Sequence, residues 1–427
     1  MSGSATLASI CTAVYRGAVA RLDAGALVTA ALGAEPLPPG QVRVAALGKA
    51  AGPMLRAALE ALGPRARTPL CVLPEGSPAP PGAEVIRGAH PRPSAGSLAA
   101  GQALLRWSGQ AGGLPALVLL SGGGSALAAA PADGVSFEEK AETVALLMRA
   151  GRPIGELNAV RKHLSALKGG RLGLRLAGAS VRVLVLSDVP GDDLSTIASG
   201  PFTGDPTSWD DVRRIMAASG VEAALPAAVR RLLAGAGAPG GLPETPKPGD
   251  PRLALVAHRV LAGPVALARA AAEAARALGF AAEADGAPLL GDVTAVAARL
   301  GAWARANAGR GPRLLALGGE PTVVVPSGAA RPDGGRAQAL ALLAALALDG
   351  LPAAALAAGS DGRDGPTERA GAVVDGTTAA SAAERGLDLE AALAAGESGP
   401  ACDALGATLP RFETGTHVGD LVLVAVR

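Results

Sequence analysis

Aromatic residues are scarce in this chain of 427 residues, where Phe, Trp and Tyr together make up only 2%. Proteins that hold single-stranded nucleic acid use aromatic side chains as platforms on which the bases stack, so this class is disfavoured. An excess of one charge is also lacking, because 39 Lys and Arg residues face 37 Asp and Glu residues and leave a net charge of +2. The basic surface typical of nucleic-acid-binding proteins is therefore not predicted, and no nucleic-acid partner is expected.

Cysteine and long apolar runs are rare as well. The three cysteines, Cys11, Cys71 and Cys402, are scattered, so neither a disulfide framework nor a metal site built on a cysteine pair is expected. The longest apolar run, residues 339–348, is too short to cross a bilayer. The N-terminus lacks the basic start and apolar core of a signal peptide. We expect a cytoplasmic protein with no membrane partner.

The length of the chain and the alternation of strand-like and helix-like segments indicate its fold class. A chain of 427 residues exceeds one ordinary core, so two domains are expected. Strand-like and helix-like segments alternate, which predicts the α/β class: two α/β domains with mostly parallel sheets flanked by helices. The Gly- and Pro-rich stretch 235–252 lacks periodicity and is interpreted as a linker. We therefore predict domains 1–240 and 241–427, with an active-site cleft between them.

The expected elements can be placed by residue number. In the first domain, strands are predicted at 42–47, 70–73, 84–86, 117–120 and 181–186, and helices at 50–62, 137–150 and 157–176. In the second domain, strands are predicted at 253–257, 314–317, 322–325, 353–358 and 420–426, and helices at 261–278, 293–308 and 336–348. Ligands of open α/β sheets bind beyond the carboxyl ends of strands, so the loops there are the candidates for chemistry.

Two such loops are suited to phosphate groups. The strand at 117–120 runs into Ser121, Gly122, Gly123, Gly124 and Ser125. Glycine lets backbone N–H groups approach an anion closely, although a tight turn with a helix cap is an equally good interpretation. The strand at 42–47 runs into Gly48 and Lys49, whose point charge suits phosphate oxygens, although most such lysines are only solvated. The Gly-Lys-Ser/Thr ending of a Walker A loop is absent.

The helix predicted at 157–176 carries a cationic face. Asn158, Arg161 and Lys162 share that face with Ser165, whereas leucines and a valine occupy the other. Most such faces are solvated, and the functional interpretation is that Asn158, Arg161 and Lys162 meet an anionic ligand. His163 lies among leucines and is expected to be packed rather than catalytic.

Three aspartates follow the apolar strand at 181–186. Asp188 and Asp192 are the first and second choices for holding Mg²⁺ through a carboxylate. The alternative is an aspartate turn followed by a helix cap at Asp193.

Further charged residues stand beside glycines in the second domain. Arg336 lies near the start of a predicted helix, where the macrodipole disfavours a cation, and a bound anion would explain this position. Candidate binding residues at the other loops are Glu320, Asp361, Thr414 and Thr416. Gly235, Gly237 and Gly240 match the G-x-G-x-x-G spacing of dinucleotide-binding loops, but no predicted strand precedes them, so we do not assign them to a dinucleotide site.

Taken in order, these motifs resemble the class II glycerate 2-kinase family, whose C-terminal half is a MOFRL-type domain and whose members are often labelled hydroxypyruvate reductases. The resemblance implies ATP-dependent phosphorylation of the C2 hydroxyl of D-glycerate, giving 2-phosphoglycerate, and catalytic roles for Lys49 and Arg336. ATP and Mg²⁺ are then the expected cofactors, with Asp188 as the catalytic metal ligand. The substrate is expected to be a small molecule, and a homodimer is one alternative for the oligomeric state.

The chain departs from that family in the second domain. Ala337 and Ala339 replace polar residues of the family motif, His258 and His417 stand where the family usually has Asn, and Ser360 where it has Thr. Two alternatives therefore stay open: an NAD(P)H-dependent hydroxypyruvate reductase, and a non-catalytic binder of sugar acids.

Overall fold

A computed structural model describes residues 6–109, 113–324 and 333–427. The chain forms two compact units, and these units interleave along the sequence. The N unit consists of residues 28–185 and 193–261, and the C unit consists of residues 1–27, 186–192 and 262–427. The predicted domains, 1–240 and 241–427, are consecutive stretches of chain, whereas the observed C unit also takes in the N-terminal helix and the first part of the aspartate loop.

The N unit is built on a six-stranded sheet with the order β3-β2-β1-β4-β5-β6. Its strands are β1 (Val42–Leu47), β2 (Ala66–Pro74), β3 (Glu84–Gly88), β4 (Ala116–Leu120), β5 (Val181–Leu186) and β6 (Val256–Ala262). Neighbouring strands from β3 to β5 pair in parallel. β1 and β4 are buried along their whole length, which explains why β4 is a continuous apolar run and why β1 is apolar apart from the buried Arg43.

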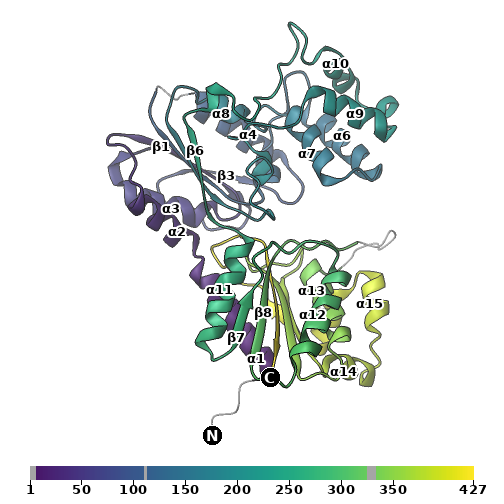
Figure 1. Ribbon diagram of the computed structural model, residues 1–427. Helices are drawn as coiled ribbons and strands as arrows, with labels where there is room; N and C mark the ends of the chain where they lie inside the picture. The colour runs from purple at the N-terminus through teal and green to yellow at the C-terminus, as the bar shows by residue number, and fades with distance from the viewer. Residues whose placement is uncertain (1–5, 110–112, 325–332) are drawn as a thin grey trace. The chain divides into compact units, whose positions relative to one another are not determined.

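Helices surround this sheet and form a second cluster beside it (Figure 1). They are α2 (Ala24–Ala34), α3 (Ala51–Leu62), α4 (Ala95–Gly109), α5 (Gly124–Leu127), α6 (Phe137–Arg149), α7 (Ile154–His163), α8 (Arg171–Leu174), α9 (Trp209–Ser219) and α10 (Ala227–Gly235), with 3-10 turns η1 (Gly63–Arg65), η2 (Ile197–Ser199), η3 (Glu222–Ala224) and η4 (Pro251–Leu253). α6, α7, α9 and α10 enclose their own apolar core around Leu147, Val160 and Trp209. This helical cluster holds the cationic residues of α6 and α7 in place.

The C unit has a second six-stranded sheet, with the order β11-β10-β9-β12-β8-β7. Its strands are β7 (Ala281–Ala284), β8 (Arg313–Gly319), β9 (Ala353–Gly359), β10 (Arg369–Asp375), β11 (Thr408–Pro410) and β12 (Asp420–Val426). β7, β8 and β9 run in one direction, and β12 lies antiparallel between β8 and β9. The start of β12 therefore lies at the same edge as the ends of β8 and β9.

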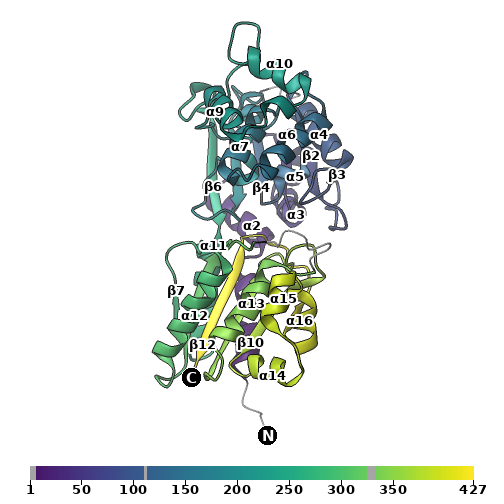
Figure 2. The ribbon, with the colours of Figure 1, turned by 90° about the vertical axis from the view of Figure 1, so that its right-hand side faces the viewer.

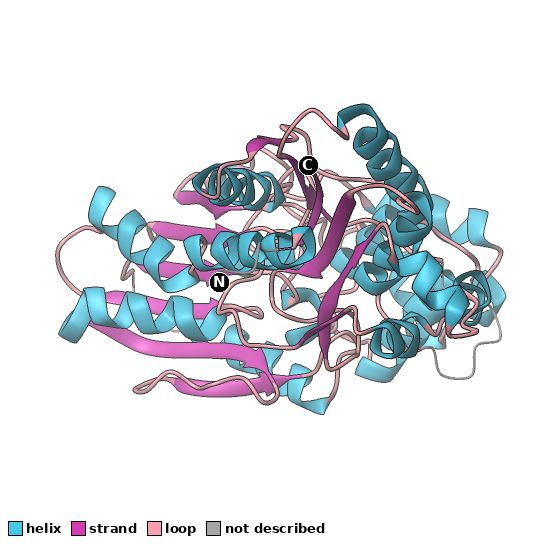
Figure 3. Cartoon of the chain, turned by 90° about the horizontal axis from the view of Figure 1, so that it is seen from below, coloured by secondary structure: helices cyan, strands magenta, loops and turns pink. Residues whose placement is uncertain are grey.

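Helices cover both faces of this sheet (Figures 1 and 3). They are α1 (Leu7–Arg21), α11 (Pro264–Ala277), α12 (Val293–Asn307), α13 (Arg336–Ala347), α14 (Thr378–Glu384), α15 (Leu389–Ala395) and α16 (Ser398–Leu405). α1 and α11 pack together on one face, and α12 and α13 pack together on the other. The predicted α/β class with helix-flanked sheets is thus confirmed.

The N-terminal segment Leu7–Ala34 is long and apolar enough to cross a membrane by length and composition alone, which is weak support for a membrane span. In the structure this segment is divided into α1 and α2, and α1 buries Val14, Ala18 and Val19 against its own unit. The apolar character of α1 is therefore accounted for by its packing inside the C unit against α11 (Figures 1 and 2).

Three predicted elements were wrong in extent. The helix predicted at 157–176 ends at His163, and a turn with glycines in the left-handed region (Gly169 and Gly170) precedes the short α8. The strand predicted at 253–257 is instead the turn η4 followed by β6. The strand predicted at 322–325 is only an isolated bridge at Thr322, and its last residue lies outside the described residues.

Candidate functional site

In the N unit, the loops that follow β1 and β4 are joined to each other at the carboxyl edge of the parallel sheet. The backbone N–H of Lys49 donates to the carbonyl of Gly122 at 3.0 Å, and the N–H of Ala50 donates to Ser121 Oγ at 3.0 Å. Gly48 has φ 131°, and a Cβ there would lie 2.2 Å from Ser121 Oγ. The close approach therefore requires glycine at this position.

Lys49 runs across the glycine loop. A Cβ placed on Gly123, whose φ is 82°, would lie 3.1 Å from Lys49 Cγ and 3.3 Å from the ring of His90. The structure thus brings together the two loops that the sequence singled out, and it adds His90, which was not among the predicted site residues. A flexible cation beside a glycine turn at a strand end is suited to phosphate oxygens.

The glycine loop continues into α5, where Ser125 is held from two sides. Its Oγ lies 2.6 Å from Ser199 Oγ, and its carbonyl accepts a 2.6 Å bond from Lys168 Nζ. Because Gly124 opens a helix of only four residues, the loop is fixed by these side-chain contacts rather than by a long helix.

The residues predicted on one cationic face separate in the structure. Arg161 is half-buried, and its Nη1 donates to Asn158 Oδ1 at 3.3 Å. Lys162 is only 5% exposed and forms a 2.8 Å ion pair with Asp205, which is fully buried. Asn158 and Arg161 therefore remain candidates for a ligand, whereas the Lys162 ammonium is committed to an internal carboxylate.

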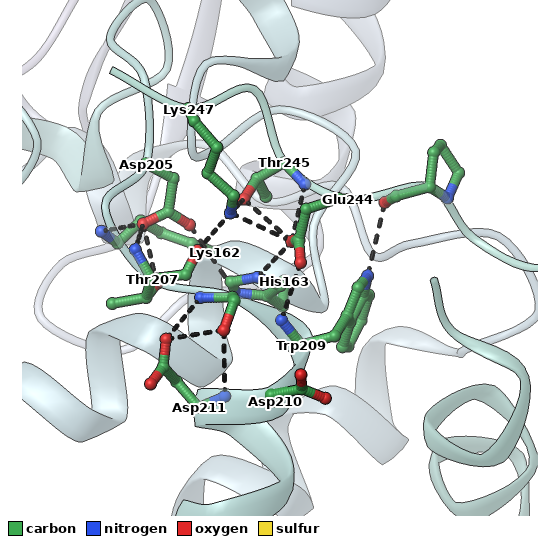
Figure 4. A network of polar contacts seen from close by, with 12 residues as sticks. Lys162, His163, Asp205, Thr207, Trp209, Asp210, Asp211, Glu244, Thr245 and Lys247 are labelled. Atoms are coloured by element: carbon green, nitrogen blue, oxygen red, sulfur yellow. Dashed lines mark hydrogen bonds and ion pairs between the residues drawn. The ribbon is translucent and has the colours of Figure 1, made fainter. Parts of the chain in front are cut away.

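His163 is packed, as the sequence predicted. Its ring lies edge-on to Trp209 with centroids 4.7 Å apart, and its Nε2 lies 2.9 Å from Glu244 Oε1. Burial lowers the pKa of His163 even though Asp205 and Glu244 oppose the change. Figure 4 shows how these residues share one polar network with Lys162 and Lys247, in which cations and carboxylates are balanced.

In the C unit, Arg336 is clamped between two carboxylates. Its Nε and Nη2 donate to Asp420 at 2.5 and 3.2 Å, and its Nη1 donates to Glu320 at 2.6 Å. Burial disfavours the charged guanidinium, but Asp420 and Glu320 outweigh burial and raise the pKa of Arg336 above its ordinary value. Arg336 opens α13, Glu320 follows β8 and Asp420 opens β12, so the sheet edge assembles the clamp.

A further carboxylate, Asp364, holds the start of α13 and was not among the predicted site residues. Asp364 lies in the predicted Asp361 loop, and it accepts hydrogen bonds from the N–H groups of Ala337 at 3.1 Å and Gln338 at 2.8 Å. It therefore caps the first turn of α13 from a distant segment, although the N-cap residue is Gly335. Burial, helped by Asp420, raises the pKa of Asp364 to about 7.

His417 lies between two aspartates of the same unit. Its Nε2 is 3.1 Å from Asp188 Oδ2, and its Nδ1 is 3.6 Å from Asp361 Oδ2. The aspartate loop and the loops after β9 and before β12 therefore meet. Thr414 and Thr416 belong to the same turn, where the Thr416 N–H donates to Thr414 Oγ1 at 3.3 Å. The sequence had singled out these loops but not their meeting point.

The predicted magnesium ligands lie in different surroundings. Asp188 is 20% exposed at its side chain, whereas Asp192 packs against Gly263 at the start of α11, with φ 55° and one carboxylate oxygen that has no hydrogen-bond partner. Among the described residues, no three His, Cys, Asp or Glu side chains gather as a metal site. Mg²⁺ is commonly held by one or two carboxylates together with substrate phosphates, and Asp188 fits that use.

Similar proteins have been found over almost the whole chain. A domain of unknown function (DUF4147) matches residues 10–234, and the MOFRL family matches residues 313–420. The chain is 36% identical to a glycerate 2-kinase of Pyrococcus horikoshii, over 91% of this chain and 88% of that protein. It is 33% identical to an Agrobacterium vitis protein that carries a hydroxypyruvate reductase name, over 91% of this chain and 88% of the relative.

A solved structure agrees with these sequence matches. The crystal structure of a glycerate kinase from Thermotoga maritima superposes with a TM-score of 0.85 at 32% identity and covers 99% of both chains. Sequence similarity, domain order and fold all point to the same group of proteins. The chain therefore belongs to the glycerate 2-kinase family and is a kinase.

Proposed function

We propose that this kinase transfers the γ-phosphoryl group of ATP to the C2 hydroxyl of D-glycerate and releases 2-phosphoglycerate. The observation that carries the proposal is the joined pair of loops after β1 and β4, where Lys49 lies against Gly123 and the backbone is fixed by Ser121. Phosphoryl transfer depends on positioning and charge neutralisation more than on covalent chemistry, so a cation held over a glycine turn is the group it needs.

Arg336 is the second cation of the proposal. Three of its five N–H groups are used by Asp420 and Glu320, which leaves two for oxygens of the transferred phosphoryl group. The clamp also fixes the plane of the guanidinium before a ligand arrives, and preorganised charge of this kind stabilises a transition state without reorganisation. We propose that one reaction uses both Lys49 and Arg336, although they belong to different units.

Asp188 is the proposed ligand for Mg²⁺, with Asp192 as the second candidate, and the metal would neutralise phosphate charge when bound. The carboxylate of Asp188 is partly exposed and is oriented by His417 Nε2 at 3.1 Å. A carboxylate oriented by a ring N–H is a common arrangement at metal sites. Glu320, Asp361, Thr414 and Thr416 would then shape the surrounding site rather than carry charge to the phosphates.

The proposal is tested by measuring ADP release with D-glycerate and locating the phosphorylated carbon by NMR. Lys49→Ala should lower kcat by roughly two orders of magnitude or more, the scale seen when one preorganised electrostatic group is removed. Arg56→Ala is the matched control, because Arg56 is an exposed cation on α3, the helix that follows Lys49. Near-normal turnover of Lys49→Ala would refute the assignment of Lys49.

Reduction of hydroxypyruvate is the second candidate activity, because two relatives from Agrobacterium vitis carry a hydroxypyruvate reductase name. The same protein preparation should therefore be given hydroxypyruvate with NADH or NADPH, and loss of absorbance at the nicotinamide band measured. We expect no oxidation, because the only G-x-G-x-x-G pattern considered above follows α10 and not a strand. Turnover of the nicotinamide without ADP release would replace the kinase proposal.

A further inference from the structure

The N unit contains a group of cations that the kinase proposal does not use in full. This cation cluster consists of Lys140 on α6, Arg161 on α7, Lys168 in the following turn and Arg171 on α8. Lys140 is 9% exposed and Lys168 is 5% exposed, while Arg161 and Arg171 are half-buried. Buried cations are normally paired with carboxylates, so a group of four cations is expected to have anionic partners.

The described residues supply no carboxylate to three of these cations. Lys140 Nζ is buried without any hydrogen-bond partner, and Lys168 Nζ donates only to the carbonyl of Ser125. Arg161 donates only to the amide oxygen of Asn158. The nearest acidic groups, Asp205 and Glu244, influence Arg171, but they are already engaged by Lys162, His163 and Lys247 (Figure 4).

The cluster is also electrostatically strained. Burial first, and then repulsion from Lys168, Arg161 and Arg171, holds the pKa of Lys140 well below its usual value. Burial together with Arg161 lowers the pKa of Lys168 to about 7. Uncompensated positive charge in the interior is costly, and an anion brought into contact would remove much of that cost.

The location indicates what kind of anion would be bound. Lys168 donates to Ser125, the last residue of the glycine loop, so the cluster lies directly against the loop that Lys49 crosses. Arg161 is the half-exposed member and can meet a ligand from solvent, whereas the buried Lys140 ammonium is disfavoured in the empty cluster and is favoured when an anion is bound beside it. A planar guanidinium with a second cation beside it matches the oxygens of a carboxylate or a phosphate.

We infer that Arg161 and Lys168, with Lys140 behind them, form a subsite for a small oxyanion: the carboxylate of the acceptor acid or a phosphate group. This inference deepens the proposed function, on which the identity of the acid rests. Arg161 and Lys168 contact the anion, and Lys140 is a positioning residue that acts through the field at the subsite.

The test is direct binding, measured by isothermal titration calorimetry on the full chain without nucleotide. D-glycerate and inorganic phosphate are titrated separately at matched ionic strength in KCl. Lys140→Met keeps most of the side-chain volume without the charge, and Arg161→Gln removes the half-exposed contact. Arg149→Gln is the control, because Arg149 is an exposed cation on the same helix as Lys140.

We expect the wild-type chain to bind at least one of the two probes. Arg161→Gln should weaken that binding by about thirtyfold or more, as expected when one partner of a desolvated charge contact is removed. Lys140→Met should weaken it on the order of tenfold, because the variant lacks the ammonium that a bound anion favours, and Arg149→Gln should leave it unchanged. Tighter binding of glycerate assigns the subsite to the acceptor carboxylate, and tighter binding of phosphate assigns it to a phosphate group.

The inference is overturned if the wild-type chain binds neither probe, or if Lys140→Met and Arg161→Gln both bind as the wild type does. If Lys140→Met fails to fold, Arg161→Gln alone decides the question, because its side chain is only half-buried. Binding does not depend on turnover, so a chain that binds phosphate through this cluster but releases no ADP from glycerate refutes the proposed function and leaves the subsite standing.

Discussion

Asp364 offers a sharp test of how the start of α13 is held. The perturbation is Asp364→Asn, which removes the buried charge and keeps the size of the side chain. In the wild type, both carboxylate oxygens accept backbone N–H groups of α13, from Ala337 and Gln338. The amide has only one acceptor, so one N–H is left without a partner at a cost of about 1–3 kcal/mol, which does not depend on pH.

The carboxylate adds a term that does depend on pH. The pKa of Asp364 rises from 3.8 to about 7 in the folded chain, so between these values the folded state holds a proton that the unfolded state has released. Raising the pH therefore favours unfolding. The contribution of Asp364 to the free energy of unfolding is therefore fully present below pH 3.8, the pKa in the unfolded chain. It is lost as the pH rises through about 7, the pKa in the folded chain, and the total loss is about 4 kcal/mol. Between pH 5 and pH 8 the loss is about 2–3 kcal/mol.

Hydrogen–deuterium exchange of α13 peptides, corrected for intrinsic exchange rates, measures this local stability. We expect the exchange protection of α13 to fall between pH 5 and pH 8 in the wild type but not in Asp364→Asn. The lower protection of the variant at pH 5 should therefore become smaller, or reverse, as the pH rises. Peptides from α9, which belongs to the N unit, are the internal control and should not distinguish the two proteins. A difference between wild type and variant that stays constant across this range would refute a buried carboxylate with a raised pKa.

Three further predictions concern positions whose surroundings the structure defines. Gly48→Ala should destabilise the chain by roughly 3 kcal/mol or more, because its Cβ would overlap Ser121 in a strained backbone region. The matched control in thermal unfolding is Gly40→Ala, at φ 96° with open space around it, and equal effects of the two variants would argue against the overlap. Asp205→Ala should lower the free energy of unfolding, measured by chemical denaturation, by roughly 3–5 kcal/mol, because it leaves Lys162 buried and unpaired. The double variant with Lys162→Met should recover part of this loss, and no recovery would mean that the broken ion pair is not the cause. Arg336→Lys should lower kcat by roughly 10²-fold with the fold intact by circular dichroism, because a lysine cannot satisfy two carboxylates and a ligand at once; wild-type turnover would show that Arg336 is structural.

Much of the architecture followed from local patterns. The buried strands β4 and β9 are apolar throughout, and β1 and β12 are apolar apart from Arg43 and Asp420. Such runs identify strands without knowledge of their neighbours. The break after His163 was missed because the apolar spacing of α7 continues past it, although α7 ends at His163 and the left-handed Gly169 and Gly170 interrupt the rest of the predicted helix before α8.

The loops at strand ends could likewise be singled out from residue type, and these included Lys49 and Arg336. Residue type did not show which partners those side chains take. The clamp on Arg336 joins residues 16 and 84 positions away, and the ion pair of Lys162 spans 43 positions. Such pairs are set by strand order and register, which the linear pattern does not contain.

The sequence by itself determined the α/β class, the family resemblance and the loops in which chemistry was to be sought, because apolar periodicity and glycine placement are local properties. Only the tertiary structure decided the burial of Lys140, the capping role of Asp364 and the interleaving of the two units. These features depend on which segments, distant in sequence, pack together and exclude water. The sequence alone does not show whether a lysine or an aspartate is exposed to solvent or buried.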